Sequence, residues 1–283
     1  MFDFENYGEL LVLVSNSLIA GAALGLVGGL AGVFVAMRDL PFAVHGISEL
    51  SFAGASGALL LGTNIVAGSI TGSLLAAGAI GVLGTRARDR NSVIGILMPF
   101  GLGLGVLFLA LYKGRAANKF GLLTGQIVAV DTPQTTWLLV TSAVVLTALA
   151  VMWRPLAFAS ADPDVAEARG VPVRGLSFAF MIVLGLAVAL SVQVVGALLV
   201  LSLLITPAAA AARVTASPVL LPLLSVAFAM TSVEGGILLA LGSSIPISPY
   251  VTTISFVLYV GCAAVGRHRT RRPGARRTVA APA

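Results

Sequence analysis

The spacing of charged residues constrains this chain more than any other feature of its sequence. No Asp, Glu, Lys or Arg occurs within residues 10–37, 50–85 or 175–212. Charged residues make up 10% of the chain and hydrophobic residues 58%, whereas a soluble domain carries about 25% charged residues. A membrane-spanning helix needs about 20 apolar residues. The first charge-free range therefore fits one span and the other two fit two spans each, which indicates a chain embedded in a bilayer.

The apolar runs predict an all-α fold, a polytopic transmembrane helical bundle of about eight or nine spans. The sixth and seventh runs follow one another without a clear turn, and we place the break between them at Gln193 to Gly196. We assign residues 1–266 to the transmembrane domain, with a loop at about 155–174, and residues 267–283 to a basic, disordered cytoplasmic tail. The nine candidate spans are 10–37, 42–62, 65–84, 94–112, 136–153, 175–193, 196–213, 217–241 and 246–265.

Clusters of arginine predict the orientation of the spans, because basic residues beside a span are retained on the cytoplasmic side. If nine spans are counted, the arginines of 86–90, 154–174 and 267–277 fall on one face. The net charge of +6 is then a topology signal, with some attraction to anionic headgroups, and we expect no nucleic-acid partner. The basic residues of 113–119 do not fit this count. The apolar stretch 120–130 after them is too short to span, so its placement is either re-entrant or interfacial.

His45 and Glu49 carry the first candidate chemistry. They lie four residues apart at the start of the second span, so on a helix they share one face, with Cβ atoms about 5–6 Å apart. An imidazole and a carboxylate so placed can ligate one divalent cation, and this chemistry suits Zn²⁺, Mn²⁺ or Fe²⁺ without choosing among them. A carboxylate inside a bilayer is costly unless it is paired or hydrated. We expect Glu49 to face the protein interior or a water-filled path; the alternative is a pair whose members only satisfy each other.

Glu234 is the other isolated acid, within the eighth span. It is either an ion contact that lines a translocation path or a carboxylate bonded to a neighbouring helix, and the sequence alone favours the structural role. Thr231 and Ser232 lie nearby, so their hydroxyls are candidates to hydrate the carboxylate.

The loop between the fifth and sixth spans has the signals of a short, capped helix. Asp162 is a suitable N-cap and Pro163 suits the first helical position. Asp164 complements the positive end of the helix dipole and Arg169 the negative end. Gly170 fits the left-handed residue that ends a helix. Such a helix is either a simple surface helix or a rigid element held against a partner.

The chain lacks the motifs of an enzyme. No G-x-x-x-x-G-K-[ST] loop occurs, and the only lysines are Lys113 and Lys119, so the chain does not bind ATP by that device. H-E-x-x-H and G-x-S-x-G are also missing, and the single cysteine, Cys262, cannot form a thiolate cluster. We therefore expect no catalysis and no cofactor bound by this chain. If ATP drives the protein, the ATPase is a separate subunit.

Three segments carry longer patterns: Arg38–Gly57, Asp162–Gly170 and Val195–Ala209. The second reads D-P-x-x-A-x-x-x-G and the third reads V-G-x-L-L-V-x-x-L-L-x-x-P-A-A. The first is similar to R-…-D-x-x-x-H-x-x-x-x-G. Together, from about Leu10 to Val265, these segments resemble the ABC-3 permease family, the membrane-spanning subunits of zinc and manganese ABC importers.

The resemblance implies a homodimeric permease that works with a pair of cytoplasmic ATPase subunits, where ATP binds, and with an extracytoplasmic metal-binding protein that delivers the ion. The family's acidic residue and histidine fall on His45 and Glu49 with the two types reversed, so a ligand pair survives while the identity of the metal stays open. By the same resemblance the capped loop is a coupling helix that docks in a groove of the ATPase. Its predicted contact residues are Asp162, Pro163, Asp164, Ala166, Glu167, Arg169 and Gly170.

We therefore predict a multi-pass permease subunit of the cell membrane for ATP-driven import of zinc or manganese. His45 and Glu49 are the predicted transient metal contacts, and Glu234 is a weaker candidate. The main alternative is a secondary metal transporter driven by protons through these three residues, which would work in vesicles with an ion gradient and no ATPase. A third hypothesis is a non-transporting scaffold or receptor, for which charge reversal at Asp164 and Glu167 would leave metal accumulation unchanged.

Overall fold

The described part of the chain folds into helices. The computed structural model describes residues 14–84, 87–114, 121–122, 132–197, 200–242 and 246–271, and no strand occurs among them. The all-α fold predicted from the sequence is therefore confirmed. The helices are α2 (Ser15–Met37), α3 (Pro41–Leu61), α4 (Ile65–Leu83), α5 (Ala87–Leu111), α7 (Thr132–Ala161), α8 (Pro163–Ala168), α9 (Val173–Val195), α10 (Val200–Leu204), α11 (Thr206–Val214), α12 (Leu220–Leu241) and α13 (Ile247–Arg271).

Eight of the described helices are long and apolar enough to cross a membrane: α2, α3, α4, α5, α7, α9, α12 and α13. The seventh predicted span, 196–213, is wrong as a full-length helix, because α10 and α11 form only a shorter apolar segment, Val200–Val214. Pro207 accounts for the interruption, since it has no N–H to donate and its ring clashes with the carbonyl one turn earlier. The predicted break before this segment is confirmed, because α9 ends at Val195 and Gly196 has a φ of 88°.

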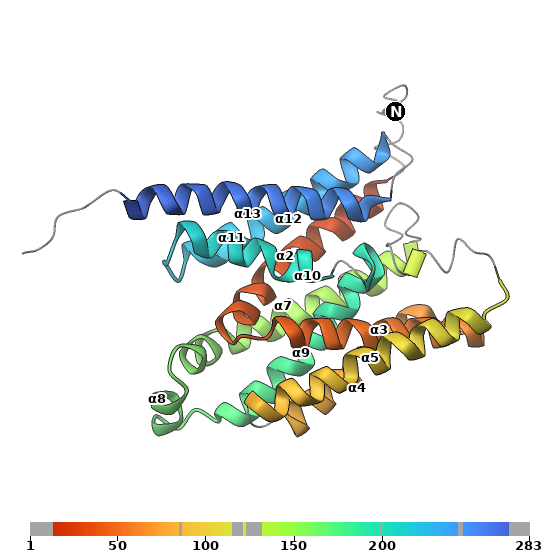
Figure 1. Ribbon diagram of the computed structural model, residues 1–283, viewed down its shortest axis with the longest axis horizontal. Coiled ribbons are helices and arrows are strands. Elements are labelled where there is room, and N and C mark those ends of the chain that lie inside the picture. The colour runs from red at the N-terminus through yellow and green to blue at the C-terminus, as the bar shows by residue number, and fades with distance from the viewer. Residues whose placement is uncertain are drawn as a thin grey trace, which may run out of the picture.

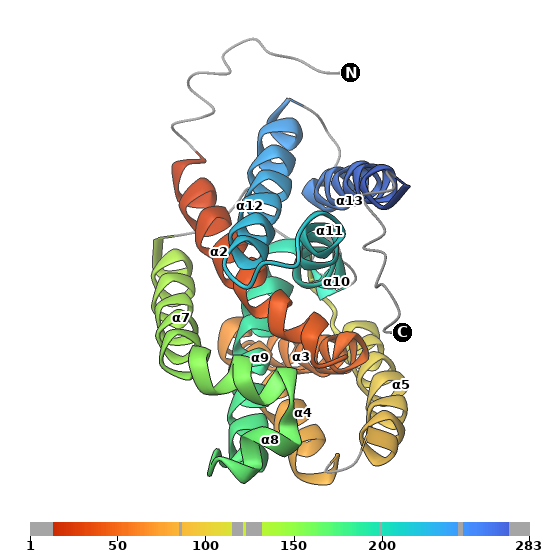
Figure 2. The ribbon, with the colours of Figure 1, turned by 90° about the vertical axis from the view of Figure 1, so that its left-hand side faces the viewer.

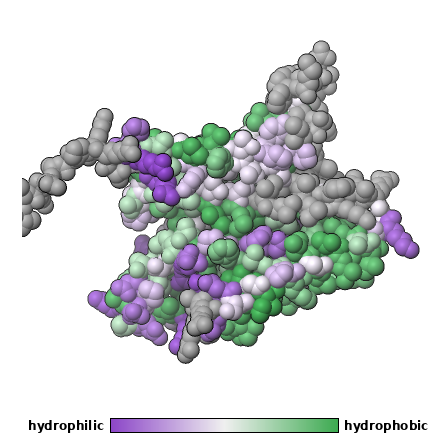
Figure 3. Space-filling model, in the orientation of Figure 1, coloured by the Kyte–Doolittle hydropathy of each residue, from purple (hydrophilic) through white to green (hydrophobic). Residues whose placement is uncertain are grey.

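Successive long helices, with α10 and α11 counted as one segment, run in opposite directions (Figure 1). The chain enters α2, α4, α7, α11 and α13 from one end of the bundle and α3, α5, α9 and α12 from the other. The C-terminal end of α4, the α7–α8–α9 segment and the C-terminal end of α13 therefore lie together, at the left in Figure 1. The sequence gathers arginine in these segments, so we assign this end to the cytoplasm. Figure 3 shows hydrophilic residues at this end and hydrophobic residues along the lower flank.

Two predicted segments lie largely outside the described residues. Of the stretch 120–130, only 121–122 are described, as helix. α13 continues to Arg271, and the rest of the predicted basic tail, 272–283, lies outside the described part. The placement of both segments stays a prediction.

Close contacts between α3 and α4 depend on glycine. A Cβ added at Gly72 of α4 would collide with the carbonyl oxygen of Leu50 on α3, and one added at Gly54 of α3 would collide with the carbonyl oxygen of Gly68 on α4. Small residues permit such close approach in a membrane, where helix association relies on van der Waals packing. The two helices therefore pack backbone against backbone. A Cβ added at Gly78, also in α4, would have no neighbouring atom within 4 Å.

We predict that Gly72→Ala lowers the melting temperature of the purified protein. The added methyl group would force α3 and α4 apart, and overpacking of this kind costs about 1–3 kcal/mol. Gly78→Ala is the matched control in the same helix, and it should hold or raise the melting temperature because Ala is favoured over Gly in a helix interior by about 1 kcal/mol. Thermal unfolding in detergent, followed by tryptophan fluorescence, measures both. Equal shifts in the two variants would show that the α3–α4 contact does not limit stability.

Candidate functional site

The candidate ligand pair lies near the start of α3. This helix begins at Pro41, whose missing N–H is not needed in the first turn. His45 Nδ1 lies 3.7 Å from Glu49 Oε1, and 29% of the imidazole but only 4% of the carboxylate side chain is exposed. This distance is too long for a hydrogen bond, and the buried His45 Nδ1 has no hydrogen-bond partner. The structure thus places both side chains on one face with the imidazole nitrogen unsatisfied.

The separation of the two side chains suits a shared cation. Metal–ligand bonds of about 2.1 Å to nitrogen and oxygen reach both atoms when the angle at the ion is about 120°. No group of three or more His, Cys, Asp or Glu able to hold a metal ion occurs among the described residues. The pair therefore offers at most two protein ligands, and a cation held there would need water or another chain to fill its other positions. A site so incomplete holds an ion weakly, which a translocation path requires because the ion must also leave.

Glu234 lies apart from this pair. α12 carries it against α2, where its Oε1 lies 2.9 Å from the position that a Cβ would take at Gly21. This oxygen is buried and has no hydrogen-bond partner. The hydroxyls of Thr231 and Ser232, which the sequence offered for hydrating the carboxylate, donate instead to carbonyls one turn earlier in α12. Glu234 is thus an acid packed between two helices, and it does not join His45 and Glu49 in one ligand group.

α8 is the capped helix that the loop sequence predicts. The Asp162 carboxylate is the N-cap and accepts a hydrogen bond of 3.0 Å from the amide of Val165, and Pro163 stands in the first turn. At the other end Gly170 has a φ of 84°, and its amide and that of the next residue donate to carbonyls in the last turn of α8. These are the two bonds of a Schellman C-cap. The segment is therefore fixed at both ends.

α8 lies at the arginine-rich end of the bundle, which faces the viewer in Figure 2. It packs on α7 and α9 and buries Ala166. The side chains of Asp164, Glu167 and Arg169 are exposed, and so is Val165. α8 thus presents a short charged surface with an apolar residue within it, on a fixed backbone.

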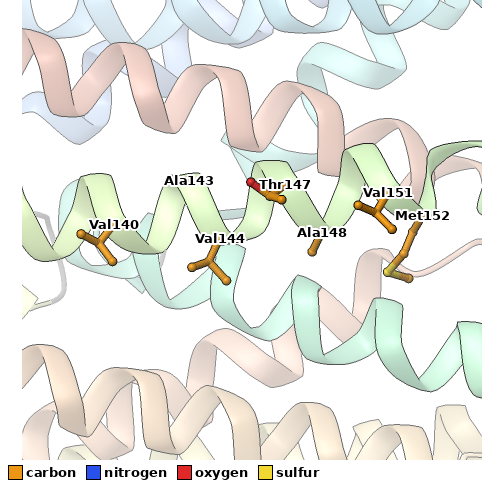
Figure 4. Close-up of a pocket in the computed structure, with 7 residues that line it drawn as sticks. All are labelled: Val140, Ala143, Val144, Thr147, Ala148, Val151 and Met152. Carbon is orange, nitrogen blue, oxygen red and sulfur yellow. The ribbon is translucent and has the colours of Figure 1, made fainter.

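Two wide apolar grooves lie away from these residues. One has a volume of about 690 Å³ and runs along α7, which supplies all seven lining residues in Figure 4. The other, of about 670 Å³, is lined by residues of α3, α4 and α5, among them Leu50 and Phe108. Neither groove is lined by His45, Glu49 or Glu234. Both are outer surfaces of the bundle and are suited to lipid chains.

The antiparallel apolar spans define a multi-pass membrane protein. The model of the ABC 3 transport family matches residues 11–266. This range covers the helical bundle from its first helix to the last turns of α13, so the chain belongs to that family.

Relatives and a solved structure agree with this assignment. The manganese import system permease protein ScaB of Streptococcus parasanguinis is 32% identical over 70% of this chain and 71% of its own length. The high-affinity zinc uptake system membrane protein ZnuB of Haemophilus influenzae is 27% identical over 86% of this chain and 94% of its own length. The structure of PsaBC from Streptococcus pneumoniae in complex with Fab has a TM-score of 0.81 at 25% identity, covering 92% of this chain and 95% of that one.

We predict that Asp162→Ala loosens α8 without unfolding the bundle. Loss of an N-cap costs about 1 kcal/mol, which corresponds to about fivefold faster amide exchange in the first turn if exchange proceeds by local opening. Hydrogen–deuterium exchange of peptides that cover 163–169 measures this change. Asp162→Asn keeps a capping oxygen and should retain the original exchange rate. If both variants exchange like the original protein, the cap does not hold α8.

Proposed function

We propose that this chain is the membrane-spanning permease of an ATP-driven importer of divalent metal ions, with manganese or zinc as its cargo. The observation that carries the proposal is the family match over residues 11–266. Relatives named as manganese and zinc permeases, which align with most of the chain, support the choice of cargo. The chain itself transports and does not catalyse.

The proposed partners follow from what the chain supplies and lacks. The sequence has no G-x-x-x-x-G-K-[ST] loop to bind ATP, so hydrolysis belongs to cytoplasmic ATPase subunits. The exposed charges and fixed backbone of α8 suit docking on such a subunit, with Asp162, Pro163, Asp164, Ala166, Glu167, Arg169 and Gly170 as the coupling segment. On the opposite face, an extracytoplasmic metal-binding protein delivers the ion.

A second copy of the chain completes the proposed metal path. His45 and Glu49 provide two ligands, and a structural or catalytic site for Zn²⁺ uses three or four protein ligands. Two copies facing each other across a shared path would bring four ligands, two from each. Imidazole and carboxylate serve both Zn²⁺ and Mn²⁺, so this pair accepts either ion.

Reconstitution tests the function directly. The permease is inserted into liposomes with its ATPase subunits, and the metal-binding protein loaded with radioactive Mn²⁺ or Zn²⁺ is supplied on the face opposite α8. Uptake is measured with ATP, with a non-hydrolysable analogue, or with a proton gradient alone. The proposed function requires uptake with hydrolysable ATP only. Uptake driven by the gradient without ATPase would establish a secondary transporter instead.

We predict that Glu49→Ala reduces ATP-driven metal uptake by at least tenfold. It removes one of two protein ligands from the path, while ATPase subunits still co-purify because α8 is unchanged. Ser56→Ala is the control: it lies two turns further along α3, and its buried hydroxyl has no hydrogen-bond partner to lose. Uptake in Glu49→Ala equal to that in Ser56→Ala would remove Glu49 from the metal path.

We predict that joint charge reversal, Asp164→Lys with Glu167→Lys, abolishes both co-purification of the ATPase and metal uptake. The two lysines would present positive charge to a docking groove that receives negative charge from α8 in the original protein. Asp89→Lys reverses an exposed acid at the same end of the bundle, in the first turn of α5, and should leave both readouts within twofold of the original. Unchanged uptake in the double variant would favour a scaffold or receptor.

A further inference from the structure

Arg38 joins three helices at the cytoplasmic end of the bundle. It directly follows α2, and its guanidinium donates from Nε to Ser160 Oγ at 2.8 Å and from Nη1 to Ser177 Oγ at 3.0 Å. Ser160 lies near the end of α7 and Ser177 near the start of α9. Along the chain, α7 leads into α8 and α9 follows it. One side chain thus connects the end of α2 to both helices that flank α8.

The orientation of each serine suits it to accept from Arg38. Each hydroxyl has one hydrogen, and that hydrogen is already donated to a carbonyl of its own helix, at 2.6 Å for Ser160 and 2.7 Å for Ser177. Only the oxygen lone pairs remain for a neighbour. The planar guanidinium presents several N–H groups in a fixed fork and reaches both oxygens together, which a lysine ammonium on a flexible stem does not reproduce.

The environment of Arg38 does not favour it for stability. Among the described residues, no carboxylate lies within ion-pair distance of its guanidinium. Burial lowers the pKa of Arg38 below its ordinary value, and the positive charge of Arg90 lowers it further. Its guanidinium lies 5.8 Å from the centre of the Phe180 ring, which gives a cation–π contact. A partly buried charge without a counter-ion is costly to desolvate, so a neutral residue would serve a purely structural role at lower cost.

A short turn links Arg38 to the candidate metal ligands. The amide of Leu40 donates to the carbonyl of Val35 at 3.0 Å, and Asp39 between them has a φ of 53°. Leu40 is buried, and α3 begins at the next residue. Only Asp39 and Leu40 separate Arg38 from the first residue of α3. A displacement of Arg38 is carried into the first turn of α3 and from there to His45.

We propose that Arg38 is the positioning residue that couples α8 to the metal path. When the ATPase moves α8, the ends of α7 and α9 move with it, and Ser160 and Ser177 pass that movement through Arg38 to the start of α3. His45 and Glu49 then shift together, because both lie on α3. This inference rests on the proposed function, since it assigns α8 to the ATPase and α3 to the ion.

The double variant Ser160→Ala with Ser177→Ala tests the proposal, because it removes both acceptors and leaves the charge of Arg38. Metal uptake and ATP hydrolysis are measured in the same liposomes. We expect the number of ions imported per ATP to fall at least fivefold, while ATP turnover stays within twofold of the original complex. A merely structural loss would lower both rates together and leave their ratio unchanged.

Ser191→Ala is the matched control. Ser191 is a buried serine of α9 whose hydroxyl donates to a carbonyl of its own helix at 2.8 Å, as Ser177 does, but the structure shows no contact between it and Arg38. Its ratio of ions to ATP should equal the original. Arg38→Lys, which keeps the charge but not the fork, should resemble the double variant. If the double variant does not assemble, the two single variants carry the test, each with a lower ratio than the control.

The outcomes separate this inference from the proposed function. An original ratio in the double variant, in the single variants or in Arg38→Lys overturns the role of Arg38 and leaves the importer intact. Lack of ATP-driven uptake in the unmodified complex overturns the proposed function and the coupling role with it. A fall in the ratio that is confined to variants of Arg38, Ser160 and Ser177 supports the proposal.

Discussion

In hydrocarbon a backbone N–H or C=O group finds no water, so it must find its partner within the protein. The described residues meet this requirement with helices alone. Side-chain hydroxyls follow the same rule: those of Ser177, Ser191 and Thr252 each donate to a carbonyl one turn earlier in their own helix. A hydroxyl bonded in this way has no spare hydrogen, so it can only accept from another helix. The two serines that contact Arg38 are bonded in this way, so each accepts from the guanidinium and does not donate to it.

The same low-dielectric surroundings decide where charge is tolerated. Arginines are gathered in the segments at one end of the bundle, where water and headgroups solvate them. Within the spans, His45, Glu49 and Glu234 are partly or wholly buried against other helices. An apolar side chain at any of these positions would pack without the cost of desolvation. These residues therefore mark places where the bundle departs from what stability alone favours, and such departures gather at functional sites.

Local features of the molecule were predictable from the sequence, and contacts between distant segments were not. Asp162 and Gly170 predict the two ends of α8 because capping depends on a few consecutive residues, and Gly196 marks the end of α9 for the same reason. Mean hydropathy alone predicts a full seventh span, because it measures apolar character and does not detect the interruption at Pro207. Arg38 lies 122 and 139 residues from its two serine partners. No local pattern reports a pairing at that separation, so the sequence identifies Arg38 as the edge of an apolar run and the start of the segment Arg38–Gly57 but predicts neither serine partner.

The packing of α3 determines how a movement at Arg38 reaches the ligand pair. Toward α4, glycines bring the two backbones into contact along more than one turn. Toward α5, a Cβ at Gly101 would lie 2.9 Å from the backbone carbon of Glu49, so this contact falls at the ligand residue itself. Backbones packed this closely do not slide past one another, because interiors at this density have few alternative arrangements. In the proposed coupling, α3, α4 and α5 therefore move together, and His45 and Glu49 keep their spacing.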